Sequence, residues 1–295
     1  MLANMLHFTH LAVCEDCLRL IQHVPEICDG FKDVATHNLE DAQLGVVMWA
    51  KSGWSRRMLY LARAGWDGRR PSDGVEGYLA YSVGSIIRRA CDKQLAPGVA
   101  DDSRKLVAYR DAVVIREVYG EAFEPLPYGH LPFGGQSNLE EHIRVLTERM
   151  MLAQHTHVPD LQKPEDWLDK MILLRNDIRD AAEYYAEAFE HPDSDLVRQY
   201  ITEPAFYGAS DDLIRVARAI QGGGSVGQNA VMQALESGKN KSQYAQALVG
   251  GLRYLRAANG YFTGKIRADQ LKEAWDATED QWPQIWDGGT ALVDV

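Results

Sequence analysis

Apolar residues recur along most of this chain at steps of three and four positions, which is the period of an α-helix. The clearest run follows Pro164, where Trp167, Met171, Leu174 and Ile178 fall on one helical stripe. Alternation with a period of two, which would indicate half-buried strands, is scarce. We therefore predict an all-α fold, a globular array of about ten helices.

The periodicity and the breakers between the runs predict where these helices lie. The expected ranges are 4–24, 38–64, 74–94, 101–121, 139–153, 165–190, 210–221, 226–237, 242–258 and 267–286. Residues 121–137 hold three prolines and three glycines, which is typical of a linker. We expect two helical subdomains, residues 1–121 and 138–295, joined by a loop over 122–137.

Charge is distributed unevenly along the chain. The 295 residues hold 31 Lys and Arg against 42 Asp and Glu, a net charge of −11. Residues 1–130 hold 15 basic and 17 acidic residues, a net of −2, which leaves 16 and 25, a net of −9, for residues 131–295. Within 51–93 nine basic residues outnumber four acidic ones, a net of +5. The chain is therefore locally basic in its first third and acidic after residue 130.

The basic segment 51–93 is the first candidate interaction surface, because aromatic residues are interleaved with its charges. Its candidate contact residues are Arg56, Arg57, Arg63, Arg69, Arg70, Arg88 and Arg89. Arginines beside aromatic rings can bind nucleic acid, a phosphorylated small molecule or an acidic protein surface. A solvated basic face is the plain structural interpretation. Among the functional interpretations, we favour an acidic protein surface.

Three tryptophans near the C-terminus form the second candidate surface. Trp275, Trp282 and Trp286 recur at steps of seven and four among acidic residues. Aromatic anchors flanked by charge suit a segment that docks in a partner's groove. The alternative is that this region packs on its own core.

No metal or cofactor site is assigned from the sequence. His7, His10, Cys14 and Cys17 share one helical face but span roughly 15 Å, too far for one tetrahedral ion, so we interpret them as part of a buried stripe. Weaker metal candidates are the pairs His155 and His157 in a loop, and Asp177 and Asp180 on one helical face. Most of the carboxylate pairs in 165–190 lie off the apolar stripe, so we expect them to face water.

The segment Gly-Gly-Gly-Ser-Val-Gly (222–227) matches a dinucleotide-binding pattern, which requires a preceding strand. The preceding residues have a helical pattern instead, so we interpret the segment as a turn. Ser225 and Gln228 have the spacing of a capping box that opens the next helix.

Four cysteines in a chain of this length do not form a disulfide framework. The N-terminus lacks the basic start of a signal peptide, and no long uncharged apolar run occurs. We therefore expect a soluble cytoplasmic protein with no membrane partner.

These patterns favour a helical interaction or assembly protein over an enzyme, although an enzyme is not excluded. We expect a homo-oligomer whose basic segment meets the acidic half of another copy, or an acidic surface of another protein. The first alternative is a metal-dependent helical hydrolase of a phosphorylated substrate, with Arg56, Arg57, Arg88 and Arg89 on the phosphate. The second is nucleic-acid binding through 51–93.

Overall fold

The structure is a computed structural model, and it describes residues 7–47, 54–65, 75–95 and 206–275, together with 110, 111, 113, 114, 117 and 118. All regular secondary structure in these residues is helical, and they contain no strand. The prediction of an all-α fold is confirmed for this part of the chain. The predicted linker 122–137 lies outside it, so the two subdomains stay a prediction.

Nine helices have defined bounds in these residues. They are α1 (His7–Ile21), α2 (Asp29–His37), α3 (Leu39–Val47), α4 (Trp54–Ala64), α5 (Val75–Gln94), α10 (Asp212–Gln221), α11 (Gln228–Glu236), α12 (Gln243–Phe262) and α13 (Ala268–Ala274). Residues 110–118 contribute further helical backbone wherever they are described.

The predicted ranges 74–94, 210–221 and 226–237 agree with α5, α10 and α11 to within two residues at each end. The periodicity does not predict α2, whose nine residues are too few for a clear period and include Gly30 in the first turn. The range 38–64 contains two helices, α3 and α4.

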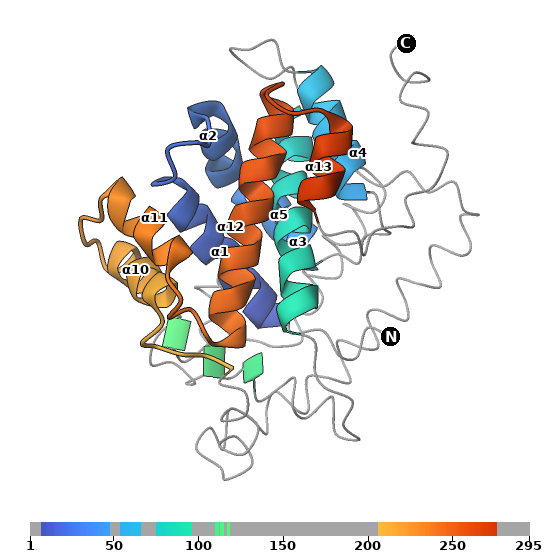
Figure 1. The fold of residues 1–295 in the computed structure, drawn as a ribbon. Helices are drawn as coiled ribbons and strands as arrows, with labels where there is room; N and C mark the ends of the chain where they lie inside the picture. The colour runs from blue at the N-terminus through green and yellow to red at the C-terminus, as the bar shows by residue number, and fades with distance from the viewer. Residues whose placement is uncertain are drawn as a thin grey trace, which may run out of the picture.

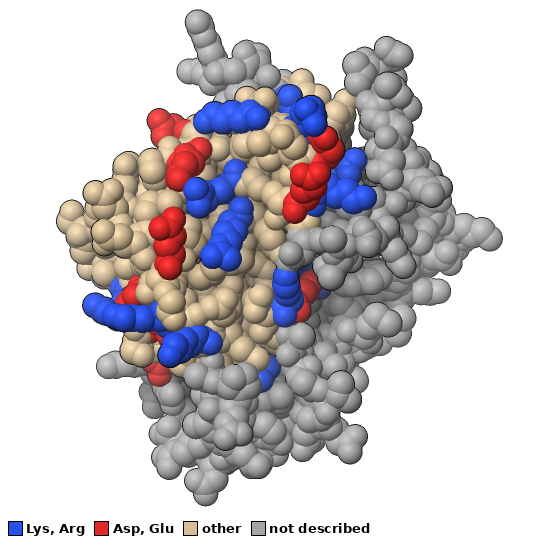
Figure 2. Space-filling model, in the orientation of Figure 1, with Lys and Arg blue, Asp and Glu red and all other residues tan. Residues whose placement is uncertain are grey.

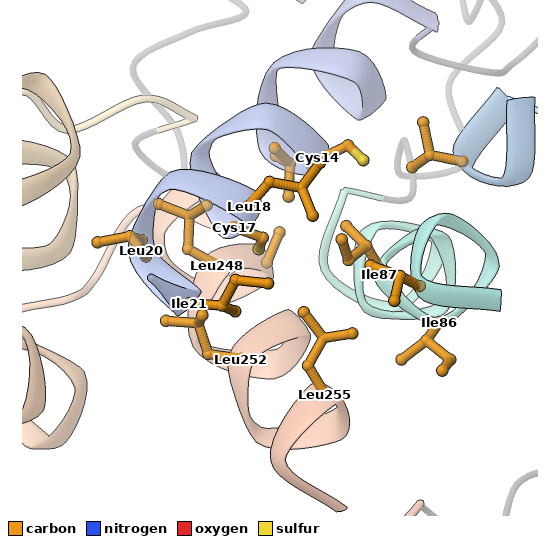
Figure 3. Packing of buried hydrophobic residues seen from close by; sticks show 14 of the residues in the cluster. Cys14, Cys17, Leu18, Leu20, Ile21, Ile86, Ile87, Leu248, Leu252 and Leu255 are labelled. Carbon is orange, nitrogen blue, oxygen red and sulfur yellow. The ribbon is translucent and has the colours of Figure 1, made fainter. Parts of the chain in front are cut away.

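Helix α1 lies in the interior and is covered on several sides. It packs against α3, α5, α10 and α12, and Figure 1 shows α12 crossing in front of it, with α5 beside α12. Close up, Cys17, Leu18 and Ile21 of α1 lie among side chains of α5 and α12 (Figure 3). The buried apolar residues of 7–95 and 206–275 belong to one core. Helices from both ends of the chain therefore share a single hydrophobic interior.

Glycines allow the closest helix crossings in this core. A Cβ added to Gly84 of α5 would lie 1.7 Å from the carbonyl oxygen of Ala42 in α3, and one added to Gly45 of α3 would lie 2.2 Å from the carbonyl oxygen of Tyr81. At Gly251 of α12 an added Cβ would lie 2.9 Å from the Cys17 sulfur. The backbones of α3 and α5 thus touch directly, with no room for a side chain between them.

The side chain of Asp111 caps the start of α1 from a distant part of the sequence. Its carboxylate accepts hydrogen bonds from the Thr9 amide at 2.8 Å, the Thr9 hydroxyl at 2.6 Å and the Phe8 amide at 3.3 Å. Both Asp111 and Thr9 are fully buried. The first turn of a helix has amide groups without internal partners and carries partial positive charge, so a carboxylate stabilises it.

We expect Asp111→Ala to lower the free energy of unfolding by about 2 kcal/mol, because the buried amides of α1 lose their acceptor. Urea denaturation measures this loss. Glu117→Ala is the matched control, since Glu117 is exposed on the same segment and should change the value by less than about 0.5 kcal/mol. Equal losses in the two variants would contradict the capping role.

Asn259 of α12 holds the loop between α1 and α2. Its side-chain oxygen accepts the Cys28 amide at 3.1 Å, and its side-chain nitrogen donates to the Glu26 carbonyl at 2.8 Å. This amide is nearly fully buried, so it satisfies backbone groups that water does not reach.

In the part of the chain that the structure describes, no helix has the length and apolar character that a membrane span requires.

Candidate interaction surface

The described part of the basic segment 51–93 forms α4 and α5, which pack against each other. Arg56 and Arg63 are half-buried on α4, Arg89 is half-buried on α5, and Arg88 is buried. The remaining predicted contact groups, Arg69, Arg70 and the side chain of Arg57, lie outside the described residues. The described part of the segment, 54–65 and 75–93, is therefore a partly buried helix pair.

Two arginines of this segment contact aromatic rings near the C-terminus. The Arg63 guanidinium carbon lies 4.7 Å from the centre of the Tyr261 ring, and that of Arg89 lies 4.9 Å from the centre of the Trp275 ring. Such cation–π contacts contribute about 0.5–2 kcal/mol each, more when water is excluded. The structure thus brings one residue of each predicted surface, Arg89 and Trp275, together within one chain.

Trp275 is 1% exposed, and its indole nitrogen donates to the Tyr254 carbonyl at 3.2 Å. The helix predicted over 267–286 is interrupted at this residue, because α13 ends at Ala274 and Trp275 has extended backbone angles (φ −91°, ψ 121°). Residues 276–286 lie outside the described residues. The buried indole and its hydrogen bond to Tyr254 hold the end of α13 against α12. Trp282 and Trp286 lie outside the described residues, so their role as anchors stays a prediction.

Charged side chains of both signs are interleaved on the visible face. Figure 2 shows Lys and Arg beside Asp and Glu over the described helices, rather than gathered in separate patches. Charged side chains at the surface also form pairs with one another, such as Arg267 with Asp269 at 2.7 Å and Arg256 with Glu26 at 2.8 Å. Exposed pairs of this kind contribute little to stability.

The hydrolase hypothesis assigns Arg88 to a substrate phosphate, but the structure shows this buried arginine paired with Asp92 of its own helix. Its Nε donates to Asp92 at 3.2 Å, and His10 of α1 lies 3.3 Å from the other oxygen of the same carboxylate. Burial alone would raise the pKa of Asp92, but the His10 hydrogen bond and the Arg88 charge outweigh it and lower the pKa below the usual value. The contact between Asp92 and His10 therefore links α5 to α1, and Arg88 holds the Asp92 carboxylate within α5.

The most concentrated polar network lies around Asp16, a fully buried residue of α1. Tyr244 of α12 donates its hydroxyl to one carboxylate oxygen at 2.7 Å, and Arg19 donates to the other at 2.8 Å. Arg218 of α10 also pairs with the second oxygen. Burial, reinforced by the negative charge of Asp16, raises the pKa of Tyr244 well above its usual value. The network connects α1, α10 and α12.

Sequence reasoning missed this network, although one signal was available. Asp16 and Arg19 have i,i+3 spacing, and Glu15 and Arg19 have i,i+4 spacing, which predicts ion pairs along one helix. Nothing in the local pattern indicates that Arg218 and Tyr244, more than two hundred positions away, complete the set.

The buried stripe on α1 is confirmed for His10, Cys14 and Cys17, and the side chain of His7 lies outside the described residues. Cys14 and Cys17 are fully buried, His10 is 3% exposed, and burial raises the thiol pKa values far above their usual range. No group of three or more potential metal ligands occurs in the residues that the structure places. The weaker candidates His155, His157, Asp177 and Asp180 lie outside those residues.

The glycine-rich segment 222–227 follows helix α10, not a strand, and Gly223 has a positive φ of 77°. The interpretation as a turn is therefore confirmed. The predicted capping box is wrong, because Gly227 is the N-cap of α11 and no side chain caps that helix. A helix that begins one residue after Gly227 places Ser225 too early to act as its cap.

Comparison with known proteins identifies no relative: no protein-family model, curated protein sequence or solved structure matches this chain.

Proposed function

We propose that this protein is a helical interaction protein that associates with itself. The basic segment 51–93 of one copy would meet the acidic, tryptophan-bearing C-terminal region of another, and an acidic surface of a different protein is the alternative partner. The four cysteines are free thiols, which fits a reducing compartment, and we place the protein in the cytoplasm.

The contact between Arg89 and Trp275 is the observation that supports this proposal. Within one chain, the guanidinium groups of Arg89 and Arg63 pack on the Trp275 and Tyr261 rings, and we propose that the same kind of pairing occurs between copies. Trp282 and Trp286 continue the same sequence pattern beyond α13. The excess negative charge after residue 130 would attract the basic segment of a second copy.

We expect the full-length protein to associate in dilute salt and to dissociate in concentrated salt, because screening weakens attraction between exposed charges. Light scattering over a concentration series measures the molecular mass directly. A monomer at high protein concentration in both dilute and concentrated salt would overturn self-association.

Two charge reversals test which surface is used. Arg56→Glu lies in the basic segment and Arg253→Glu lies on an exposed position of α12, and each changes the net charge by the same two units. We expect Arg56→Glu to weaken association about tenfold and Arg253→Glu to leave it nearly unchanged. Equal effects of the two variants would show that net charge, and not the basic segment, governs association.

A further inference from the structure

A groove of about 900 Å³ lies between α10 and α11, two helices that lie side by side in Figure 1. Small and apolar side chains line much of it, namely Val216, Ala219, Val226, Ala230 and Ala234. Ala219 and Ala230 are exposed. The groove is therefore open to a partner, and its alanines leave room for bulky aromatic side chains.

Positive charge gathers at one end of this groove. Ser237 lines the groove, and the turn that follows it carries Lys239 and Lys241. Both lysines are exposed, and neither forms an ion pair with a residue that the structure describes. Residues 206–275 hold nine basic and five acidic residues, a net of +4. These helices are thus a basic part of the otherwise acidic C-terminal half, and they suit an acidic partner.

The segment that follows Trp275 has the complementary composition. Residues 276–295 hold five acidic residues and no basic residue, and Trp282, Ile285 and Trp286 lie among them. Large apolar anchors flanked by charge are typical of a segment that binds in a groove. The anchors suit the alanines and valines of the groove, and the carboxylates suit the lysines at its end.

The groove lies within reach of this segment. The Trp275 indole is bonded to Tyr254 on α12. At the start of the same helix, the Ser242 amide donates to Asp211, which directly precedes α10. The helix rises about 18 Å from Ser242 to Tyr254, whereas an extended chain covers about 36 Å from Trp275 to Trp286. So short a tether gives an effective concentration of about millimolar, which favours the segment's own chain over a second copy.

We propose that segment 276–295 docks in the groove between α10 and α11 of its own chain. Trp282 and Trp286 enter the groove, and the acidic side chains face Lys239 and Lys241. This contact goes beyond the proposed self-association and regulates it, because a segment held by its own chain is withheld from a second copy.

Photo-cross-linking of the full-length protein tests this contact. Trp286→p-benzoylphenylalanine places the cross-linker in the segment, and an equal mixture of ¹⁴N- and ¹⁵N-labelled protein shows whether the two joined peptides come from one copy. We expect cross-links to residues 212–237 in which both peptides carry the same isotope. Cross-links elsewhere, or none, would overturn the proposal. Pairs of mixed isotope would also overturn it while supporting self-association, so the two proposals can fail separately.

A charge reversal tests the lysines at the end of the groove. We expect Lys239→Glu combined with Lys241→Glu to lower the yield of the cross-link about fivefold, because attraction becomes repulsion. Arg253→Glu combined with Lys265→Glu is the matched control, since both residues are exposed, lie outside the groove and give the same change in charge. The control should keep nearly the full yield. Equal losses in the two double variants would overturn docking at this end of the groove.

Discussion

Gly84→Ala is expected to destabilise the protein by about 3 kcal/mol or to prevent folding, because the added methyl group has no room. Its Cβ would lie 1.7 Å from the Ala42 carbonyl oxygen and 2.9 Å from the Val46 amide nitrogen. Both atoms belong to the backbone of α3, so no side-chain rotation relieves the overlap. Helices α3 and α5 would have to separate, and the interior around Tyr81 and Ile86 would lose its packing.

Thermal or urea denaturation of the purified variant measures the loss. Gly238→Ala is the matched control, because an added Cβ there has no atom within 4 Å and the residue lies in an exposed turn. We expect the control to change stability by less than about 0.5 kcal/mol. If Gly84→Ala is as stable as Gly238→Ala, the crossing of α3 and α5 is not as close as described.

Asp16→Ala is expected to lower the free energy of unfolding by about 3–5 kcal/mol, which is typical when one member of a buried ion pair is removed. The variant leaves Arg19, Arg218 and the Tyr244 hydroxyl without their shared acceptor. Tyr244 is fully buried and the two arginines are half-buried, and each of the three groups loses a charge-assisted hydrogen bond.

A second substitution separates the network from the mere loss of a side chain. In Asp16→Leu combined with Arg218→Met, the charge that lost its partner is also removed, so the double variant should lose less stability than the sum of the single variants. Asp269→Ala serves as the exposed control, because Asp269 pairs with Arg267 on the surface, and it should leave the stability nearly unchanged. Additive losses at Asp16 and Arg218 would contradict the coupling between α1 and α10.

The helical pattern of the sequence predicts the fold class and the position of α5, α10 and α11, because each presents its apolar residues at the helical period. The pattern misses α2, because nine residues are too few to establish a period. It does predict a helix over α1, but α1 is buried on nearly all sides, so its apolar stripe identifies only one of its contacts. The end of α13 at Ala274 depends on the docking of Trp275, which is a tertiary effect.

The candidate surface could be predicted only in part. Local charge identifies Arg63 and Arg89 as members of a basic segment, but it does not reveal that Tyr261 and Trp275 cover them. A hollow between α1, α2, α3 and α10 gives no signal in the sequence, because four separate elements form its walls. Contacts between residues far apart in the chain follow from packing rather than from local pattern.

Helices from both ends of the chain share one core around α1, and native-state hydrogen exchange tests this cooperative unit most directly. The core amides of α5 and α12 should exchange with the same free energy of opening, and the moderate destabilisation expected of Asp111→Ala should lower both equally. Loss of protection in α5 while α12 stays fully protected would contradict a single folding unit.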